Sequence, residues 1–416
     1  MPELITNTET GTPLAASSQS IHDLNKVPQL TKAVLRIALK IHWGELTIVL
    51  PDGQALHFKG QVPGKASTLQ IKDYKCAAKL LTNGATGMGE AYMDGLWDSP
   101  NLSEMLQVVA QNAEYFREYF MGRGWGRTIG RIMHLANRNS RAGSKRNIEA
   151  HYDLGNDFYS KWLDATMTYS SAKFSDGNQS LADAQLNKYR SLAKQIGLRA
   201  EHQVLEIGCG WGGFAEFAAS EIGCHVTGVT ISREQLEFAR KRMAAKGLAE
   251  KVDIQYKDYR DIEGEFDRVV SIEMFEAVGE EYWPSFFTKV HDVLRVGGQA
   301  GLQIITIADD YFDSYRKNAD FIQRYIFPGG MLPSPSALAD QVSSAGFEWK
   351  DNISFGKDYA HTLALWRDRF QGAWPDIQPL GFDERFRRMW HMYLGYCEAG
   401  FSAGTVDVTQ LTLRRN

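Results

Sequence analysis

The stretch that decides the fold is VLEIGCGWGG, residues 204–213, followed by the helix-like FAEFAASE. The apolar residues Val204, Leu205 and Ile207 predict a short strand. The glycines at 208, 210, 212 and 213 predict a tight turn into a helix that begins near Phe214. A turn of this kind brings the backbone close to a ligand.

The chemistry around this turn indicates which ligand it binds. Read from Gly208, the turn fits the dinucleotide pattern G-x-G-x-x-G only loosely. A pyrophosphate needs a helix N-terminus free of competing charge, but Glu206 precedes the turn and Trp211 lies inside it. An acid favours a cationic ligand, and methyltransferases that use S-adenosylmethionine carry an acid-Ile-Gly-x-Gly loop after their first strand. We therefore predict S-adenosylmethionine, with a nicotinamide cofactor and a glycine turn that serves packing alone as the alternatives.

The segments after the turn alternate between strand and helix patterns up to residue 307. Strands are predicted at 224–230, within 252–262, within 266–279 together with the turn that follows, and at 297–307, with a helix after 231 capped by Ser232 or Thr230. This order specifies an α/β fold with a doubly wound, Rossmann-like sheet. Ligands bind at the carboxyl ends of strands in such sheets, which places Glu273 and Glu276 at the mouth of the pocket.

Polar residues at the other strand ends supply candidate cofactor contacts. No acid ends the second strand to bind a ribose, but Thr230 and Gln235 offer neutral hydrogen-bonding groups there. Asp258, Tyr259 and Arg260 follow the third strand, where an adenine would be held. The aromatic-rich segment 148–174 ends in the hydroxyl-bearing Tyr169 and Ser170, which are predicted to meet the cofactor carboxylate; a core segment that covers the sheet is the alternative.

A chain of 416 residues is too long for one compact core and predicts two domains. We expect a disordered tail at 1–27, a smaller N-terminal α+β domain at 28–118, a basic linker at 119–147 and the methyltransferase domain at 148–416. The N-terminal domain is predicted to contain a helix at 30–38, a hairpin around Pro51-Asp52-Gly53 and an amphipathic helix that starts at Ser103. A docking or structural role without chemistry is expected for it. The final helix carries an apolar stripe from Phe386 to Phe401 that includes Cys397.

Composition bounds the compartment and the chemistry. The first 27 residues lack the basic and apolar order of a signal peptide, and there is no apolar run near 18 residues, so a cytoplasmic protein is expected. The four cysteines show no C-x-x-C pairing and therefore indicate neither a metal site nor a disulfide framework.

The linker is strongly basic although the whole chain has a net charge of −4. No acid occurs at 121–148, and a helix at 124–138 would place apolar residues on one face with arginines beside it. That pattern is typical of a helix lying in an anionic membrane surface. A solvated linker is the alternative, and nucleic acid is not expected as a partner because no aromatic stacking ladder accompanies the basic residues. Those residues are Arg123, Arg127, Arg131, Arg138, Arg141, Lys145 and Arg146.

Nine motifs together resemble the cyclopropane fatty acid synthase family over residues 30–412. They occur in the family's order: HYDLGNDFY, MTYSSAKF, LEIGCGWGG, GVTISREQ, DYRD, MFEAVG, RYIFPGGMLP, DYAHTLALW and MYLGYCEAGF. The resemblance implies a lipid-associated N-terminal domain, a linker and a methyltransferase domain, commonly in a homodimer on the inner membrane face. It also implies transfer of a one-carbon unit from S-adenosylmethionine to the double bond of a phospholipid acyl chain through a carbocation.

The same resemblance implies a bicarbonate ion that acts as the general base. Carried over to this chain, the ion would be held by Glu276, by Tyr359 and by the backbone at Ser171 and Ile305, with Cys397 as an active-site cysteine. Gln303 stands where the family has a histidine, so bicarbonate is expected to bind more weakly and a methyl- or methylene-branched product becomes the alternative to a ring. The implied cofactor contacts are Tyr169, Ser170, Glu206, Gly208, Gly210, Thr230, Gln235, Asp258 and Tyr259.

Two other functions compete with this interpretation. A methyltransferase for a soluble small molecule would show no dependence on membranes. A lipid-binding or regulatory protein with a degenerate cofactor site belongs to a different class, and the intact Glu206, Gly208 and Gly210 argue against it.

Overall fold

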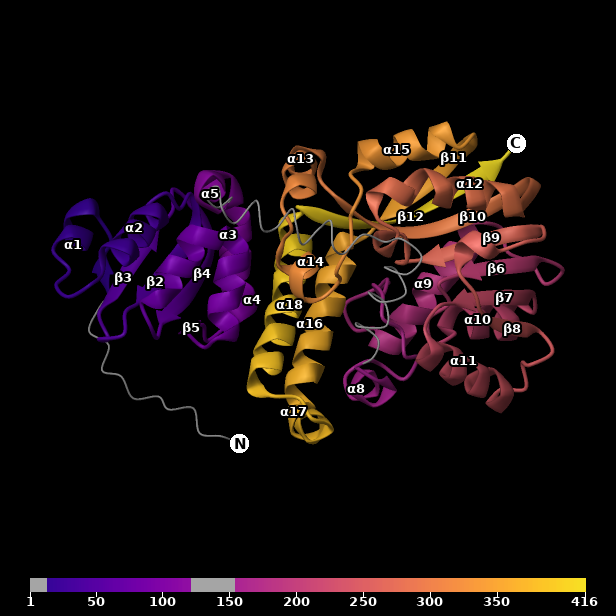
Figure 1. Ribbon diagram of the computed structural model, residues 1–416, viewed down its shortest axis with the longest axis horizontal. Coiled ribbons are helices and arrows are strands. Elements are labelled where there is room, and N and C mark those ends of the chain that lie inside the picture. The colour runs from indigo at the N-terminus through magenta and orange to yellow at the C-terminus, as the bar shows by residue number, and fades with distance from the viewer. Residues whose placement is uncertain (1–12, 121–153) are drawn as a thin grey trace. The chain divides into compact units, whose positions relative to one another are not determined.

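The computed structural model describes residues 13–120 and 154–416. The chain forms two compact units, Met1–Arg131 with Phe382–Ala403 and Ile132–Gly381 with Gly404–Asn416 (Figure 1). Most of the predicted basic linker, residues 121–147, and the start of the aromatic segment lie outside the described residues. In the part of the chain that is described, no helix has both the length and the apolar character needed to cross a membrane.

The first unit is built on a five-stranded sheet in the order β1-β3-β2-β4-β5. The predicted hairpin is confirmed, because β2 and β3 pair antiparallel around residues 50–54, and the predicted helix at 30–38 is α2. The strands are β1 (Leu14–Ala15), β2 (Trp43–Val49), β3 (Ala55–Lys59), β4 (Val62–Ile71) and β5 (Trp97–Asp98), and the helices are α1 (Ser18–His22), α2 (Gln29–Ala38), α3 (Lys75–Met93), α4 (Leu102–Gln111) and α5 (Ala113–Phe120).

The expected disordered tail is wrong for residues 13–27. Strand β1 pairs with β3, and Ser17 caps α1 through a reciprocal pair of hydrogen bonds with Ser20. Ile21 and Leu24 are buried in the core of this unit. These apolar side chains at helical spacing supply the burial that a polar composition seemed to rule out.

The predicted cap at Ser103 is also wrong by two residues. Asn101 caps α4 by accepting a hydrogen bond from the backbone N–H of Glu104 (3.2 Å), whereas Ser103 is buried and bonds to Gln107. The predicted helix then breaks at Asn112, whose side-chain oxygen accepts from the backbone N–H groups of His42 and Trp43. This side chain thereby fixes the start of β2.

The last helix, α18 (Glu384–Ala403), belongs to the first unit, which corrects the expected single domain at 148–416. Arg388 forms an ion pair with Asp98 (3.2 Å), and the hydroxyl of Tyr92 hydrogen-bonds to His391 (2.9 Å). Gly395 admits Leu106 of α4 to within 3.3 Å of where a Cβ would lie. Polar and apolar contacts of α18 therefore hold it against the N-terminal sheet domain, although this helix follows the methyltransferase segments in sequence.

The second unit contains a seven-stranded sheet in the order β11-β12-β10-β9-β6-β7-β8. Strands β6 to β10 run parallel, while β12 is antiparallel to both β10 and β11. The predicted doubly wound α/β sheet is confirmed. Its strands are β6 (Gln203–Ile207), β7 (His225–Thr230), β8 (Val252–Tyr256), β9 (Phe266–Ile272), β10 (Leu294–Ile307), β11 (Phe347–Ser354) and β12 (Val406–Arg415).

Helices cover both faces of this sheet, and each face has its own apolar core (Figure 1). Helices α9 (Leu181–Gln195), α10 (Gly213–Phe217) and α11 (Arg233–Ala245) pack on one face with Val204 and Val226. Helices α12 (Trp283–Val293) and α15 (Pro335–Ser344) pack on the other face with Leu205 and Leu302. Because side chains alternate along a strand, Glu206 faces the same side as Val204, toward α9.

The remaining α-helices of the described part of this unit lie before β6, between β10 and β11, or after β11. They are α8 (Asn156–Ser160), α13 (Asp309–Lys317), α14 (Phe321–Tyr325), α16 (Gly356–Gly372) and α17 (Trp374–Ile377).

Candidate active site

The site lies where the strand order reverses, at the carboxyl ends of β6 and β9. The glycine turn is fixed to β7, because the backbone N–H groups of Gly208 and Cys209 both donate to the carbonyl of Val229 (3.0 Å each). Gly208 has φ +79°, and a Cβ there would lie 2.6 Å from the Cγ of Met274. Only glycine combines this backbone conformation with this close approach.

Glu206 is the last residue but one of β6, just before the turn, and is 3 % exposed. Among the described residues its Oε2 atom has no hydrogen-bond partner. Burial raises the pKa of its carboxyl group to about 8, against the attraction of Lys188. A buried carboxylate oxygen beside an open glycine turn fits the ammonium group of S-adenosylmethionine, so the residues present suit the predicted cofactor.

Lys188 is a site residue that the sequence analysis missed. It lies on α9, is 0 % exposed, and its Nζ donates to the Oγ of Ser170 (2.6 Å). Burial lowers its pKa to about 7, against the raising effects of Glu273, Asp164 and Glu206. The available signal was its position on the buried face of α9, four residues from both Ala184 and Leu192.

Glu273 is the second group whose role the sequence analysis missed, although it was placed at the pocket mouth. It directly follows β9 with φ +49°, a backbone conformation that is uncommon for residues other than glycine. Its Oε1 accepts from the backbone N–H of Ser171 (2.8 Å) and from the amide of Gln303 (2.7 Å). Its Oε2 accepts from the hydroxyl of Tyr359 (2.6 Å). Burial raises the pKa of this carboxyl group, while these donors lower it.

Glu276 lies one turn further along, in a short 3₁₀ helix. Its Oε1 accepts from the backbone N–H of Ile305 (2.6 Å), and its Oε2 has no hydrogen-bond partner among the described residues. Burial and the charge of Glu273 raise the pKa of its carboxyl group to about 8. The two glutamates therefore form a pair of buried acids whose pKa values are both raised.

The structure thus brings together the predicted residues Glu276, Gln303, Tyr359, Ser171 and Ile305. The four donors expected around bicarbonate, however, bond to carboxylates of the chain itself. Three of them bond to Glu273 and one bonds to Glu276.

An aromatic cluster adjoins these acids. The ring of Tyr169 lies 5.3 to 5.6 Å from the rings of Tyr159, Trp162 and Trp366, measured between centroids. Trp366 also contacts Tyr359 at 6.1 Å. Since Tyr359 bonds to Glu273, the predicted cofactor contact Tyr169 and the acid pair border one region.

The predicted ribose and adenine contacts are placed at the ends of β7 and β8. The hydroxyl of Thr230 donates to the side-chain oxygen of Gln235 (2.9 Å), so these two residues lie together. Asp258 is paired with Arg260 (2.6 Å). The ring of Tyr259 packs against Phe286 of α12 at 5.6 Å. The ring of Tyr259 is thus partly buried against the apolar core on the α12 face of the sheet.

Cys397 is the one predicted catalytic residue that lies in the first unit. It is half-buried on α18. All other predicted site residues belong to the second unit.

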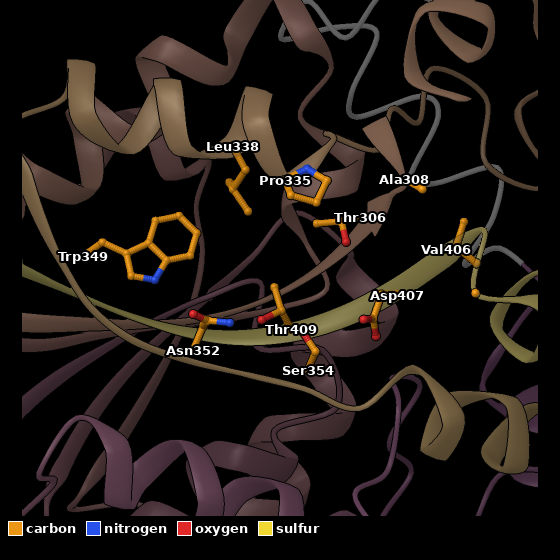
Figure 2. A pocket seen from close by; sticks show the side chains of 11 residues that line it. Thr306, Ala308, Pro335, Leu338, Trp349, Asn352, Ser354, Val406, Asp407 and Thr409 are labelled. Atoms are coloured by element: carbon orange, nitrogen blue, oxygen red, sulfur yellow. The ribbon is translucent and has the colours of Figure 1, made fainter. Parts of the chain in front are cut away.

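A separate cavity of about 250 Å³ lies on the face of the sheet that α15 covers, opposite to α9 (Figure 2). Thr306 lines this cavity. Gln303 lies three residues earlier on β10 and therefore faces the other side of the sheet, toward α9, because side chains alternate along a strand. Asp407 is its one acid, and its Oδ1 already accepts from the N–H groups of Gly356 and Val408 (2.8 Å each). This cavity therefore lies apart from the acid cluster. Its lining residues are Thr306, Ala308, Pro335, Leu338, Trp349, Asn352, Ser354, Gly404, Val406, Asp407 and Thr409.

The sheet order, the glycine turn and the buried acid beneath it, one oxygen of which has no hydrogen-bond partner among the described residues, define an S-adenosylmethionine-dependent methyltransferase. Comparisons with known proteins agree. The family model described as mycolic acid cyclopropane synthetase matches residues 139–411. This chain belongs to that family and is a lipid methyltransferase.

Relatives extend over nearly the whole chain. The tuberculostearic acid methyltransferase UfaA1 of Mycobacterium tuberculosis is 39% identical over 97% of this chain and 93% of its own length. The cyclopropane-fatty-acyl-phospholipid synthase of Escherichia coli is 35% identical over 90% and 94%. A crystal structure of the mycolic acid cyclopropane synthase CmaA1 with SAH and CTAB matches with a TM-score of 0.61 and 30% identity, covering 65% of this chain and 97% of that one.

The raised pKa of Glu206 predicts that cofactor binding releases a proton. With a pKa of about 8, the carboxyl group is about nine-tenths protonated at pH 7, and it must ionise to attract an ammonium group. Affinity for S-adenosylmethionine should therefore rise roughly tenfold per pH unit from pH 6 and level off above pH 8. Calorimetry in buffers of different ionisation enthalpy measures the proton release.

Glu206→Gln is the matched control for this titration, because its side chain is neutral at every pH. It should bind the cofactor more weakly and release no proton. An affinity of the unaltered protein that stays constant between pH 6 and pH 8 would contradict this account.

Proposed function

We propose that the protein transfers a one-carbon unit from S-adenosylmethionine to the double bond of an unsaturated acyl chain within a phospholipid. The observation that carries the proposal is the aromatic cluster around Tyr169 beside the buried acids Glu273 and Glu276. When bound, the cofactor supplies an electrophilic methyl group. An alkene that accepts this methyl group becomes a carbocation. The cation needs a dry, apolar surrounding with aromatic rings, and one base must then remove a proton from it.

The residues of the second unit suit these requirements. Ring faces at Tyr169 and Trp366 can stabilise a cation by up to about 2 kcal/mol each where water is excluded. Trp162 and Trp366 are almost completely buried, so the rings form a rigid wall rather than a mobile surface. Glu206, with its unpaired oxygen, would orient the cofactor, and Lys188 holds the neighbouring Ser170.

The carbon that loses the proton decides the product. If the proton leaves the transferred methyl group, the freed electron pair closes a cyclopropane ring, or forms a methylene branch once a hydride has shifted from the methylated carbon to the cationic carbon. If it leaves a neighbouring chain carbon, a methyl branch remains beside a new double bond. A saturated methyl branch would need a reductant in addition. The relative named a tuberculostearic acid methyltransferase favours a branched product, and the relative named a cyclopropane synthase keeps the ring as the second candidate.

We also propose that the reaction takes place at the cytoplasmic membrane surface and that the protein is a homodimer. The acid-free basic segment 121–148 supports the first part, because anionic lipid attracts each basic residue by about 1 kcal/mol.

The test is incubation of the protein with S-adenosylmethionine deuterated in its methyl group and with phospholipid vesicles, followed by mass spectrometry of the released fatty acids. Vesicles of unsaturated phospholipid should gain one labelled carbon, and vesicles of saturated phospholipid should gain none. Retention of all the methyl deuterium identifies a methyl branch, and loss of one deuterium identifies a ring or a methylene group. Equal labelling of saturated lipid would refute the alkene mechanism.

A further inference from the structure

The carboxylate of Glu273 is held as a bound anion would be held. Three donors from three different segments converge on its two oxygens: the backbone of Ser171, the amide of Gln303 on β10 and the hydroxyl of Tyr359 on α16. Gln303 is in turn fixed, because its own oxygen accepts from the amide of Gln410 on β12 (3.1 Å). Gln303 and Gln410 are both 0 % exposed. The donors therefore form a rigid cradle.

A bicarbonate ion does not fit this cradle beside Glu273. Bicarbonate and a side-chain carboxylate are both planar anions with the same need for N–H and O–H donors. The donors at Ser171, Gln303 and Tyr359 are engaged by Glu273 at 2.6 to 2.8 Å. A second anion there would also be repelled by the carboxylate of Glu273 and would find none of these three donors free.

The backbone at Glu273 shows a strain that a purely structural acid would not need. Its φ of +49° lies in the left-handed region, which costs on the order of 1 kcal/mol for a residue with a side chain. Glycine would adopt this conformation without cost. The side chain is thus kept at the site despite the backbone, and strain of this kind gathers at functional positions.

We propose that Glu273 is the general base of the reaction and occupies the cradle in place of an exogenous bicarbonate ion. This inference rests on the proposed function. The π electrons of the alkene form the new bond to the methyl carbon as its bond to sulfur breaks, and the acyl chain becomes a cation. Glu273 then accepts a proton. If the proton leaves a chain carbon adjacent to the cation, the electron pair of the broken C–H bond forms a double bond; if it leaves the transferred methyl group, that pair closes the ring. Glu273 later returns its proton to water.

The experiment replaces Glu273 by glycine and offers small anions in its place. Glu273→Gly empties the cradle and removes the strain, so the variant should fold. In the labelled-vesicle assay its turnover should fall by about a hundredfold or more, and bicarbonate or formate should restore at least tenfold of that loss. The unaltered protein should change less than twofold when bicarbonate is removed by degassing. Glu281→Gln, an exposed acid nearby, is the matched control and should behave as the unaltered protein.

A second readout does not depend on turnover. In a titration with ¹³C-labelled bicarbonate followed by NMR, the Glu273→Gly variant should bind the ion and the unaltered protein should not. Bicarbonate binding to the unaltered protein, or full turnover of Glu273→Gly without added anion, overturns the inference. Failure of the proposed function looks different, because the unaltered protein would then label no unsaturated lipid at all.

Discussion

Replacing Lys188 by methionine is expected to lower the free energy of unfolding of the methyltransferase unit by roughly 1 to 3 kcal/mol at pH 8, because the Oγ of Ser170 loses its buried donor and two acids lose the cation that attracts them. The lysine is completely buried and attracts both Glu206 and Glu273. Without it, ionised carboxylates would remain in an apolar surrounding without that compensation. The pKa values of both acids, already raised by burial, should rise further.

The pH dependence of this loss identifies its cause. An acid whose pKa is raised on folding binds more protons in the folded state, so its contribution to stability falls as pH rises from the unfolded value toward the folded one. The destabilisation by Lys188→Met should therefore be smaller at pH 6 than at pH 8. Denaturant unfolding at the two pH values measures it. Lys194→Met, on the exposed face of the same helix, is the control, and equal stability of the two variants at pH 8 would contradict the prediction.

The second large effect is expected at the glycine turn. Gly208→Ala should weaken binding of S-adenosylmethionine by about a hundredfold or more, because two costs add. A side chain at φ +79° costs about 1 to 2 kcal/mol. The new methyl group would lie 2.6 Å from Met274 and must push the turn or that side chain away, at a further cost of about 1 to 3 kcal/mol. Calorimetric titration with the cofactor measures the loss.

Gly247→Ala separates the two costs. Gly247 also has a positive φ, of 68°, but no atom lies within 4 Å of the position that an added methyl group would take, and it lies in the turn after α11. It should lose a similar amount of stability to backbone strain while binding the cofactor normally. If both variants bound the cofactor alike, the contact with Met274 would not be what fixes the turn.

Sequence patterns located the second unit well because its signals are local. An apolar strand followed by glycines specifies the turn at Gly208 and Gly210, and strand–helix alternation specifies the order of the sheet. Thr230 and Gln235, both predicted at one strand end, lie together there. The errors arose where a distant partner decides the outcome. Asn101 rather than Ser103 caps α4, and α18 packs on a domain almost 300 residues earlier in the chain, as the contact of Tyr92 with His391 shows.

By itself, the sequence determined that this protein is an S-adenosylmethionine-dependent methyltransferase of a lipid-modifying family, because strand periodicity, glycine spacing and an acid beside them are properties of neighbouring residues. Only the tertiary structure decided what the acids do. Lys188, Gln303 and Tyr359 come from three separate elements, and no local pattern shows that they surround Glu273. Burial and hydrogen-bond donors set the protonation of a carboxyl group, and both exist only after these elements have packed together.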